Sequence, residues 1–340
     1  MTMKRFTFKR ILATISVVCL CAITTVILAE YIKSNKGYES FGDTYSSECY
    51  SMRTKDGYKL INSKTGKTTI DKIDWLLASD QYSDTLVVFS KKNKRGYFNR
   101  YTGEVTIPEQ YTHAWIFAEG LAAVVSNDKI GFINQQGKVV IGFQYPYFKD
   151  NAKNINFVFR NGYCSMFDGS GKCGIINQKG EWVLAPSFDY IETPVYGKRL
   201  FRNNKKYGVL DESLHVAIPA EYAYIELTKD AAVVTRTDES KSLLSYKGEM
   251  INPCVYSSIA RLDYDTGKYT DSGIEISEPT GLYCYGMVNS YGLMSEDGKP
   301  ITPPLYKDIT PINKNLFQCT LKGSYSAIII DRKGNVIKQE

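Results

Sequence analysis

Apolar and polar positions recur in the same order along most of this chain. Residues 128–148 read DKIGFINQQGKVVIGFQYPYF, with a glycine-led apolar pair, a polar turn that holds a second glycine, and another apolar run. Two short apolar runs joined by a glycine-containing turn are typical of a β-hairpin. The arrangement occurs eight times, at residues 60–70, 96–108, 131–142, 174–186, 208–219, 242–253, 292–303 and 328–339.

Each copy carries turn residues in fixed places. A short polar side chain begins the turn, where it can accept hydrogen bonds from backbone amides two residues further on. A glycine follows in seven copies and can adopt a positive φ without steric cost. The fifth copy has Leu214 at this place, so we expect a different turn there. The polar residues are Asn62, Asn99, Asn134, Asn177, Asp211, Ser245, Ser295 and Asp331, and the glycines are Gly66, Gly103, Gly137, Gly180, Gly248, Gly298 and Gly334.

Further extended segments lie between the hairpins, for example LAAVVS at 121–126 and AAVVTR at 231–236. The leading positions recur at intervals of 34 to 50 residues, which indicates a stacked or radial array. We therefore predict an all-β repeat array of about eight short β-hairpin units, as a β-propeller with seven or eight blades, with a β-solenoid as the alternative. To close the ring, we expect residues 49–54 to complete the sheet begun by residues 328–338.

The N-terminus predicts one transmembrane helix. Residues 11–29, ILATISVVCLCAITTVILA, hold 19 residues without a charge and follow four basic residues. Such a helix rises about 28 Å, close to the hydrocarbon thickness of a bilayer, and the basic residues place the N-terminus in the cytoplasm. Cleavage of this segment as a signal peptide, with secretion, is the alternative. We predict a cytoplasmic basic segment (1–10), a signal-anchor (11–29), a tether (30–47) and a repeat β domain (48–340).

The repeat unit resembles the WG-repeat family, also called KWG repeats. The resemblance rests on KIGFINQQGKVVIGFQY, KCGIINQKGEWVLAP and KKYGVLDESLHVAIPAEY and covers roughly residues 55–339. The copies are divergent, because none of the residues that precede the marker glycines is tryptophan. The resemblance implies a bacterial repeat protein, often exported or associated with the cell envelope, whose function is presumed to be binding. The residues before the marker glycines are Arg95, Ile130, Cys173, Tyr207 and Tyr291.

Composition narrows the class of partner. The chain has 26 Tyr and 15 Phe but only 3 Trp, which suits half-buried strands. Its 42 basic and 36 acidic residues leave a formal net charge of +6, and no basic stretch is interleaved densely with aromatic residues. Nucleic acid is therefore not an expected partner.

Candidate chemistry is sparse. The two histidines, His113 and His215, lie in unlike contexts, which excludes a histidine-rich metal centre and leaves a Ser/His/Asp triad with little support. G-x-S-x-G, P-loop and H-E-x-x-H motifs are absent from the sequence. We predict no catalytic residues, no metal and no cofactor, and hence no enzyme. Paired carboxylates from distant blades would still allow an extracytoplasmic enzyme that hydrolyses a glycan or an ester.

Six cysteines lie outside the predicted anchor. An exported location permits disulfides, and Cys164 and Cys173 are candidates for one across the connection NGYCSMFDGSGKCG. The alternative is that these cysteines are buried thiols that pack as small hydrophobic side chains.

The longest departure from the repeat is residues 261–286, RLDYDTGKYTDSGIEISEPTGLYCYG, which we expect to form a solvated loop. Loops on a rigid scaffold often carry function, and tyrosine combines a broad apolar face with a polar tip. The candidate ligand-binding residues are therefore Tyr264, Tyr269, Tyr283 and Tyr285.

These patterns favour a membrane-tethered, extracytoplasmic binding or scaffold module of a bacterial envelope. Its expected partner is an envelope polymer or a protein. A sensor ectodomain that acts through a membrane partner is a further alternative, since residues 1–10 are too short for a cytoplasmic signalling domain.

Overall fold

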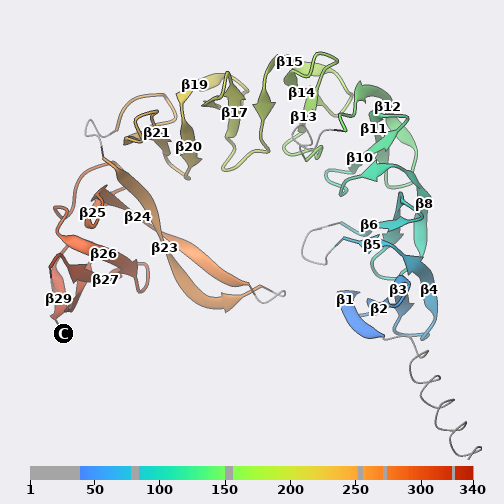
Figure 1. The fold of residues 1–340 in the computed structure, drawn as a ribbon, viewed down its shortest axis with the longest axis horizontal. Coiled ribbons are helices and arrows are strands. Elements are labelled where there is room, and N and C mark those ends of the chain that lie inside the picture. The colour runs from blue at the N-terminus through green and yellow to red at the C-terminus, as the bar shows by residue number, and fades with distance from the viewer. Residues whose placement is uncertain are drawn as a thin grey trace, which may run out of the picture. The chain divides into compact units, whose positions relative to one another are not determined.

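The computed structural model describes residues 39–77, 84–149, 156–251, 256–270, 274–323 and 326–339. These residues form β-strands and turns, without a helix (Figure 1). Among them, no helix is long and apolar enough to span a membrane. The predicted signal-anchor, residues 11–29, lies outside the described residues and stays a prediction.

The chain divides into two compact units, Met1–Ser79 with Val87–Gln110 and Asp80–Leu86 with Tyr111–Glu340. The first unit holds two four-stranded sheets whose strands follow one another in chain order. These are β1 (Ser40–Ser46), β2 (Cys49–Thr54), β3 (Gly57–Asn62) and β4 (Thr68–Ile73), then β5 (Trp75–Leu76), β6 (Leu86–Lys91), β7 (Lys94–Asn99) and β8 (Val105–Tyr111).

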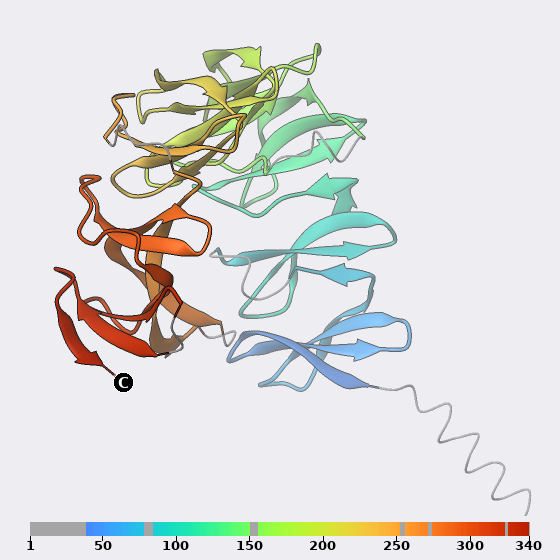
Figure 2. The same ribbon diagram turned by 60° about the vertical axis from the view of Figure 1, so that its left-hand side comes forward.

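The second unit begins with four sheets of three or four strands, again in chain order. Figure 2 shows these sheets following one another from green to yellow. The strands are β9 (His113–Ala114), β10 (Leu121–Ser126), β11 (Lys129–Asn134) and β12 (Val139–Pro146); β13 (Tyr163–Phe167), β14 (Cys173–Asn177) and β15 (Trp182–Phe188); β16 (Tyr190–Ile191), β17 (Arg199–Asn203), β18 (Lys206–Leu210) and β19 (Val216–Tyr222); and β20 (Tyr224–Leu227), β21 (Ala232–Thr235) and β22 (Lys241–Leu244).

A seven-stranded sheet ends the second unit and combines two repeats. One residue pair, Tyr291 opposite Tyr306, joins the two repeats between β25 and β26. The all-β prediction and the antiparallel hairpins are confirmed in the described residues. The strands of this sheet are β23 (Ser258–Tyr269), β24 (Glu275–Met287), β25 (Ser290–Ser295), β26 (Tyr306–Pro311), β27 (Leu316–Leu321), β28 (Ala327–Asp331) and β29 (Val336–Gln339).

Two predictions about the ends of the array are wrong. Residues 40–46, assigned to the tether, form β1, which pairs with β2. Because β2 has β1 on one side and β3 on the other, residues 49–54 do not complete the C-terminal sheet. The polar sequence of β1 hid this strand. Its buried side chain, Tyr45, is 1% exposed and donates a hydrogen bond to the Leu77 carbonyl at 3.0 Å.

In most repeats the middle strands are covered on both faces, although β2, β27 and β28 alternate between buried and less buried residues. In β10 and β11, successive residues are buried without alternation, whereas the outer strand β12 alternates between buried and exposed positions. A strand buried on both faces needs a neighbouring sheet on each side. One apolar core accordingly runs through the sheets β9–β12, β13–β15 and β16–β19, from Ile130 and Phe132 to Ile175 and Phe201.

The marker glycine of the repeat allows a close approach of the outer strand. At Gly131 and Gly174, the pairing with the outer strand is interrupted by a bulge. A Cβ at Gly174 would lie 2.5 Å from the carbonyl oxygen of Leu184, which is far inside van der Waals contact. Any side chain at this place would therefore push the outer strand away.

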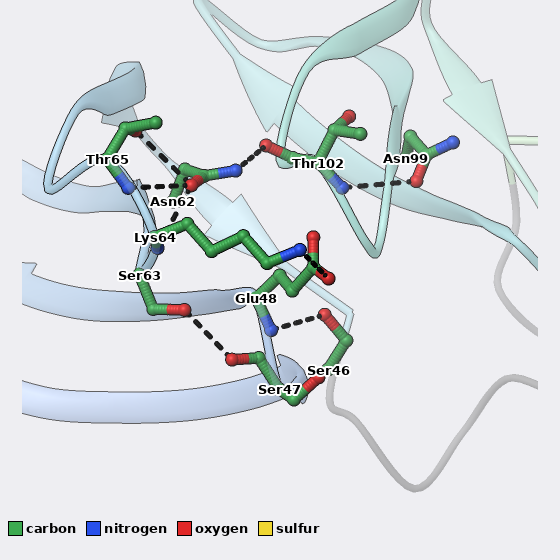
Figure 3. Close-up of polar contacts among 9 residues, drawn as sticks. All are labelled: Ser46, Ser47, Glu48, Asn62, Ser63, Lys64, Thr65, Asn99 and Thr102. Carbon is green, nitrogen blue, oxygen red and sulfur yellow. Dashed lines mark hydrogen bonds and ion pairs between the residues drawn. The ribbon is translucent and has the colours of Figure 1, made fainter.

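The turns confirm the predicted roles of asparagine and glycine. The Oδ1 atom of Asn62 accepts hydrogen bonds from the amides of Lys64 and Thr65, each at 3.1 Å, while its Nδ2 donates to the carbonyl of Thr102 in the next repeat (Figure 3). The prediction for the fifth copy is wrong. Leu214 adopts a φ of +65° and its amide donates to the Asp211 carbonyl at 3.0 Å, as Gly180 does to Asn177. The turn geometry is kept, and the leucine side chain packs against the core.

The structure places Cys164 and Cys173 as free, buried thiols. Cys164 lies opposite Ile176, and Cys173 lies opposite Phe167. The two cysteines are thus three positions apart along the ladder, about 10 Å, and point to opposite faces of the sheet. A disulfide needs Cα atoms within roughly 7 Å, so the predicted bond does not form in this structure.

Candidate functional site

The prediction of a solvated loop at residues 261–286 is wrong, because this segment belongs to a long β-hairpin. Strands β23 and β24 have 12 and 13 residues, whereas the next strand, β25, has 6. Figure 1 shows the hairpin extending well past the end of β25. Polar residues dominate the sequence here because this part of the hairpin has solvent on both faces, which removes the apolar alternation by which strands are recognised.

The outer part of the hairpin pairs only with itself. Strand β25 pairs with residues 282–287 of β24, and β23 is the last strand of its sheet. Residues 263–269 and 275–279 therefore have no second strand partner among the described residues. We call residues 263–270 and 274–279 the projecting hairpin. Its two edges leave backbone amides and carbonyls without ladder bonds, as in other edge strands.

Two arginines fix the base of the projecting hairpin. Arg261 binds both carboxylate oxygens of Asp263, at 2.6 and 2.7 Å, and donates to the hydroxyl of Tyr196 at 3.0 Å. The Asp263 carboxylate raises the pKa of Arg261. Arg332, from the β28–β29 turn, donates to the carbonyls of Thr280 at 2.5 Å and Lys314 at 2.8 Å. These contacts hold the hairpin where it leaves the sheet.

The structure separates the four candidate tyrosines into two pairs. Tyr283 and Tyr285 are each 3% exposed and belong to a core cluster with Leu243 and Ile259. The Tyr283 hydroxyl shares a hydrogen bond of 2.8 Å with that of Thr228. Burial raises the pKa of Tyr283. These two tyrosines are core residues, so their assignment to a binding surface is corrected.

Tyr264 and Tyr269 lie on the projecting hairpin. The Tyr264 hydroxyl donates to the Glu278 carboxylate at 2.8 Å, and Tyr269 is 61% exposed. The hairpin exposes two further apolar side chains, which the sequence analysis did not identify. Ile274 is 60% exposed and Ile276 is 37% exposed. The sequence IEISE, residues 274–278, places its two isoleucines two positions apart, as in a β-strand with both side chains on one face. This spacing could have indicated the strand.

The projecting hairpin is acidic. Its described residues carry one ammonium group, that of Lys268, and four carboxylates, those of Asp263, Asp265, Glu275 and Glu278. Asp265 accepts a hydrogen bond from Ser277 at 2.7 Å. The hairpin therefore combines exposed apolar side chains with a negative rim.

Within the described ranges, no group of three or more His, Cys, Asp or Glu side chains is placed to hold a metal ion. The predicted absence of a metal, of a cofactor and of catalytic residues stays a prediction.

Comparisons with known proteins agree with the repeat architecture. Four segments match the family model described as WG containing repeat, at residues 96–129, 130–164, 174–207 and 291–320. These matches support a WG-repeat family for this chain, in line with the resemblance seen in its turns. No curated protein matches the sequence.

Several solved structures are similar in part. The computationally designed Ika8 protein has a TM-score of 0.36 and 11% identity, and the alignment covers 88% of this chain and 96% of that chain. BamB from Moraxella catarrhalis has a TM-score of 0.38 and 11% identity, with coverage of 83% and 95%. A eukaryotic initiation factor has a TM-score of 0.43 and 9% identity, with coverage of 86% and 84%. These scores are too low for the likenesses to carry any functional argument.

Proposed function

We propose that this WG-repeat chain is a membrane-tethered, extracytoplasmic binding or scaffold module that holds a protein partner on its projecting hairpin. The four WG-repeat matches and the framework of packed sheets suit a scaffold that presents a binding element. The observation that carries the proposal is the hairpin itself, which leaves its sheet and exposes Tyr269, Ile274 and Ile276.

The chemistry of the hairpin indicates what kind of partner it fits. Ile274 and Ile276 share one face of the hairpin, and Tyr269, which lies opposite Glu275, is on the other. Large exposed apolar side chains act as anchors at protein interfaces, and a charged rim sets the partner's orientation. Besides Asp263, which Arg261 binds, the rim carries three carboxylates against one ammonium group. The partner surface should therefore combine an apolar pocket with basic residues. An envelope polymer remains the second candidate for the same surface.

Site-specific photocrosslinking in cells tests this proposal. A photoreactive amino acid replaces Tyr269, and a control carries it at Tyr224, which is 53% exposed and lies on β20. We expect one discrete protein adduct from position 269, none from position 224, and loss of the adduct when Ile274 and Ile276 are both changed to Ser.

Co-sedimentation with isolated envelope polymers covers the other partner class. Saturable pelleting that depends on Tyr269, without a protein adduct, would show that the partner is a polymer and not a protein. An adduct that survives the Ile274→Ser/Ile276→Ser change would refute the assignment of the hairpin. Release of soluble fragments from the polymer would point instead to a hydrolase.

The finer architecture and the location belong to the same proposal. Seven or eight repeats arranged as a propeller would give a closed ring without free sheet ends, whereas a solenoid would be elongated. Small-angle scattering of the detergent-solubilised chain distinguishes these shapes. Protease accessibility of the repeats in intact and in lysed cells tests the extracytoplasmic location.

A further inference from the structure

A cavity of about 530 Å³ lies beside the sheet β13–β15 in the second unit. The neighbouring sheets, β9–β12 and β16–β19, each begin with a two-residue edge strand, β9 or β16. The sheet β13–β15 has three strands, and residues 156–159, which precede it, form no strand in the described part of the chain. The cavity is lined by Trp115, Asn156, Ser165, Tyr190, Glu192 and Thr193.

The repeats can be compared position by position at this edge. Cys49, Leu121 and Tyr163 each lie opposite the turn asparagine of their repeat, so Ser51, Ala123 and Ser165 are equivalent. The Ala123 carbonyl accepts a hydrogen bond at 3.0 Å from the backbone amide of Trp115, a residue of the segment that continues β9. At the equivalent Ser165, the carbonyl accepts a hydrogen bond from the Cys164 thiol, with the two atoms 3.5 Å apart, where Ala123 accepts one from a backbone amide.

The hydroxyl of Ser165 is buried without a partner. Ser165 is 4% exposed, and its Oγ has no hydrogen-bond partner among the described residues. The equivalent Ser51 is equally buried, but its Oγ is bonded to the backbone amide and carbonyl of Asp43 on the adjacent β1. An unsatisfied buried hydroxyl costs about 1 to 3 kcal/mol, so natural proteins seldom keep one without a reason.

The charged groups around the cavity do not favour a charged ligand. Glu192 lines the cavity, and burial raises its pKa. Arg199, 4% exposed, donates to the carbonyls of Glu192 at 3.3 Å and Arg160 at 3.1 Å and forms no ion pair within the described residues. Arg199 thus contacts the backbone of Glu192 and not its carboxylate. The Glu192 side chain disfavours an anion, and because burial favours its uncharged form it attracts a cation only weakly, so a neutral ligand fits the cavity best.

The remaining lining groups suit a polyhydroxylated ligand. Ser165, Thr193 and Asn156 can each donate and accept hydrogen bonds, as sugar hydroxyls can. Trp115 and Tyr190 supply aromatic faces for the apolar C–H face of a sugar ring. The Trp115 ring is held edge-on by Phe157, with centroids 5.0 Å apart. Aromatic walls with a few convergent polar groups are typical of small-ligand sites.

We propose that this cavity binds one neutral saccharide unit, with the Ser165 hydroxyl bonding a sugar hydroxyl and the sugar ring stacked on Trp115. The site is separate from the projecting hairpin and does not depend on the proposed protein partner. Its occupant replaces the polar contacts that an edge strand supplies to Ser51 in the first sheet.

The test uses the full chain in detergent and a panel of neutral mono- and disaccharides, with choline and inorganic phosphate as charged probes. Ligand-observed NMR and Trp fluorescence report binding. We expect saturable binding of at least one neutral sugar that falls at least tenfold in Ser165→Ala and in Trp115→Phe. The exposed control Ser187→Ala, on β15, should leave binding unchanged.

Stability separates loss of binding from loss of folding. Ser165→Ala restores the residue type found at Ala123, so the variant should be at least as stable as the parent protein. Tyr269→Ala should keep sugar binding, which distinguishes this site from the hairpin. No binding of any neutral sugar, preferential binding of choline or phosphate, or sugar binding that persists in both Ser165→Ala and Trp115→Phe would each overturn the proposal.

Discussion

Replacing Gly180 by alanine should destabilise the second unit far more than the same change at Gly162. Gly180 lies in the β14–β15 turn with a φ of +82°. A Cβ there would lie 2.7 Å from Cγ2 of Ile141 and 3.2 Å from the Tyr145 hydroxyl, both on β12 of the preceding sheet. Ile141 is 2% exposed and has little room to move. The turn is therefore a point where one repeat is pressed against its neighbour.

Three contributions set the size of the effect. An alanine in the left-handed region costs about 1 to 2 kcal/mol, and overpacking a closed site costs about 1 to 3 kcal/mol. The Tyr145 hydroxyl donates to the Gly180 carbonyl at 2.6 Å, and moving the turn weakens this bond by up to about 1 kcal/mol. We expect Gly180→Ala to lower the free energy of unfolding by about 2 to 6 kcal/mol.

Gly162 is the matched control. Its φ is +78°, and a Cβ there would meet no atom within 4 Å, so Gly162→Ala should cost only about 1 to 2 kcal/mol for the backbone. Urea unfolding of the full chain, followed by circular dichroism and Trp fluorescence, measures both. Trp182 lies edge-on to Tyr145, with centroids 5.7 Å apart, and reports the local contact. Equal losses for the two variants would refute the close contact between repeats.

Three further predictions concern burial. Tyr283→Phe removes the buried bond to Thr228 and should lower the free energy of unfolding by about 1 kcal/mol, whereas Tyr269→Phe should leave it unchanged; thermal unfolding of both variants checks this. Burial raises the pKa of Cys173 to about 12 and also raises the pKa of Cys164. Both thiols should therefore stay unmodified by iodoacetamide at pH 8 until the protein unfolds. Modification of either thiol in the native protein would contradict the structure. Folding raises the pKa of Glu192, so the charged carboxylate destabilises the folded protein above that pKa, and this cost is absent below the unfolded pKa near 4.3. Glu192→Gln should therefore stabilise the protein at pH 7 but not at pH 3, as measured by urea unfolding. An equal effect at both pH values would show that desolvation of the carboxylate is not the cause.

Local pattern was sufficient for most of the repeat architecture. The hairpins, the turn asparagines and the positive φ of the turn glycines follow from interactions within a few residues, which any sequence window contains. The turn at Leu214 shows the limit of this reasoning. The packing of neighbouring strands imposes the left-handed conformation there although the residue disfavours it.

The candidate sites depended on what tertiary neighbours supply. Tyr269 lies where β23 and β24 pair only with each other and is exposed, whereas Tyr283 is buried in a core cluster with residues of the preceding sheet. Ser51 and Ser165 occupy the same place in their repeats, but β1 bonds the hydroxyl of Ser51, whereas no described residue bonds that of Ser165. Local sequence pattern identified most strands and turns, but not β1 or the projecting hairpin, whose polar sequences lack the apolar alternation of a half-buried strand. The exposure of each side chain could be known only from the folded chain, because it depends on neighbouring sheets that are remote in the sequence.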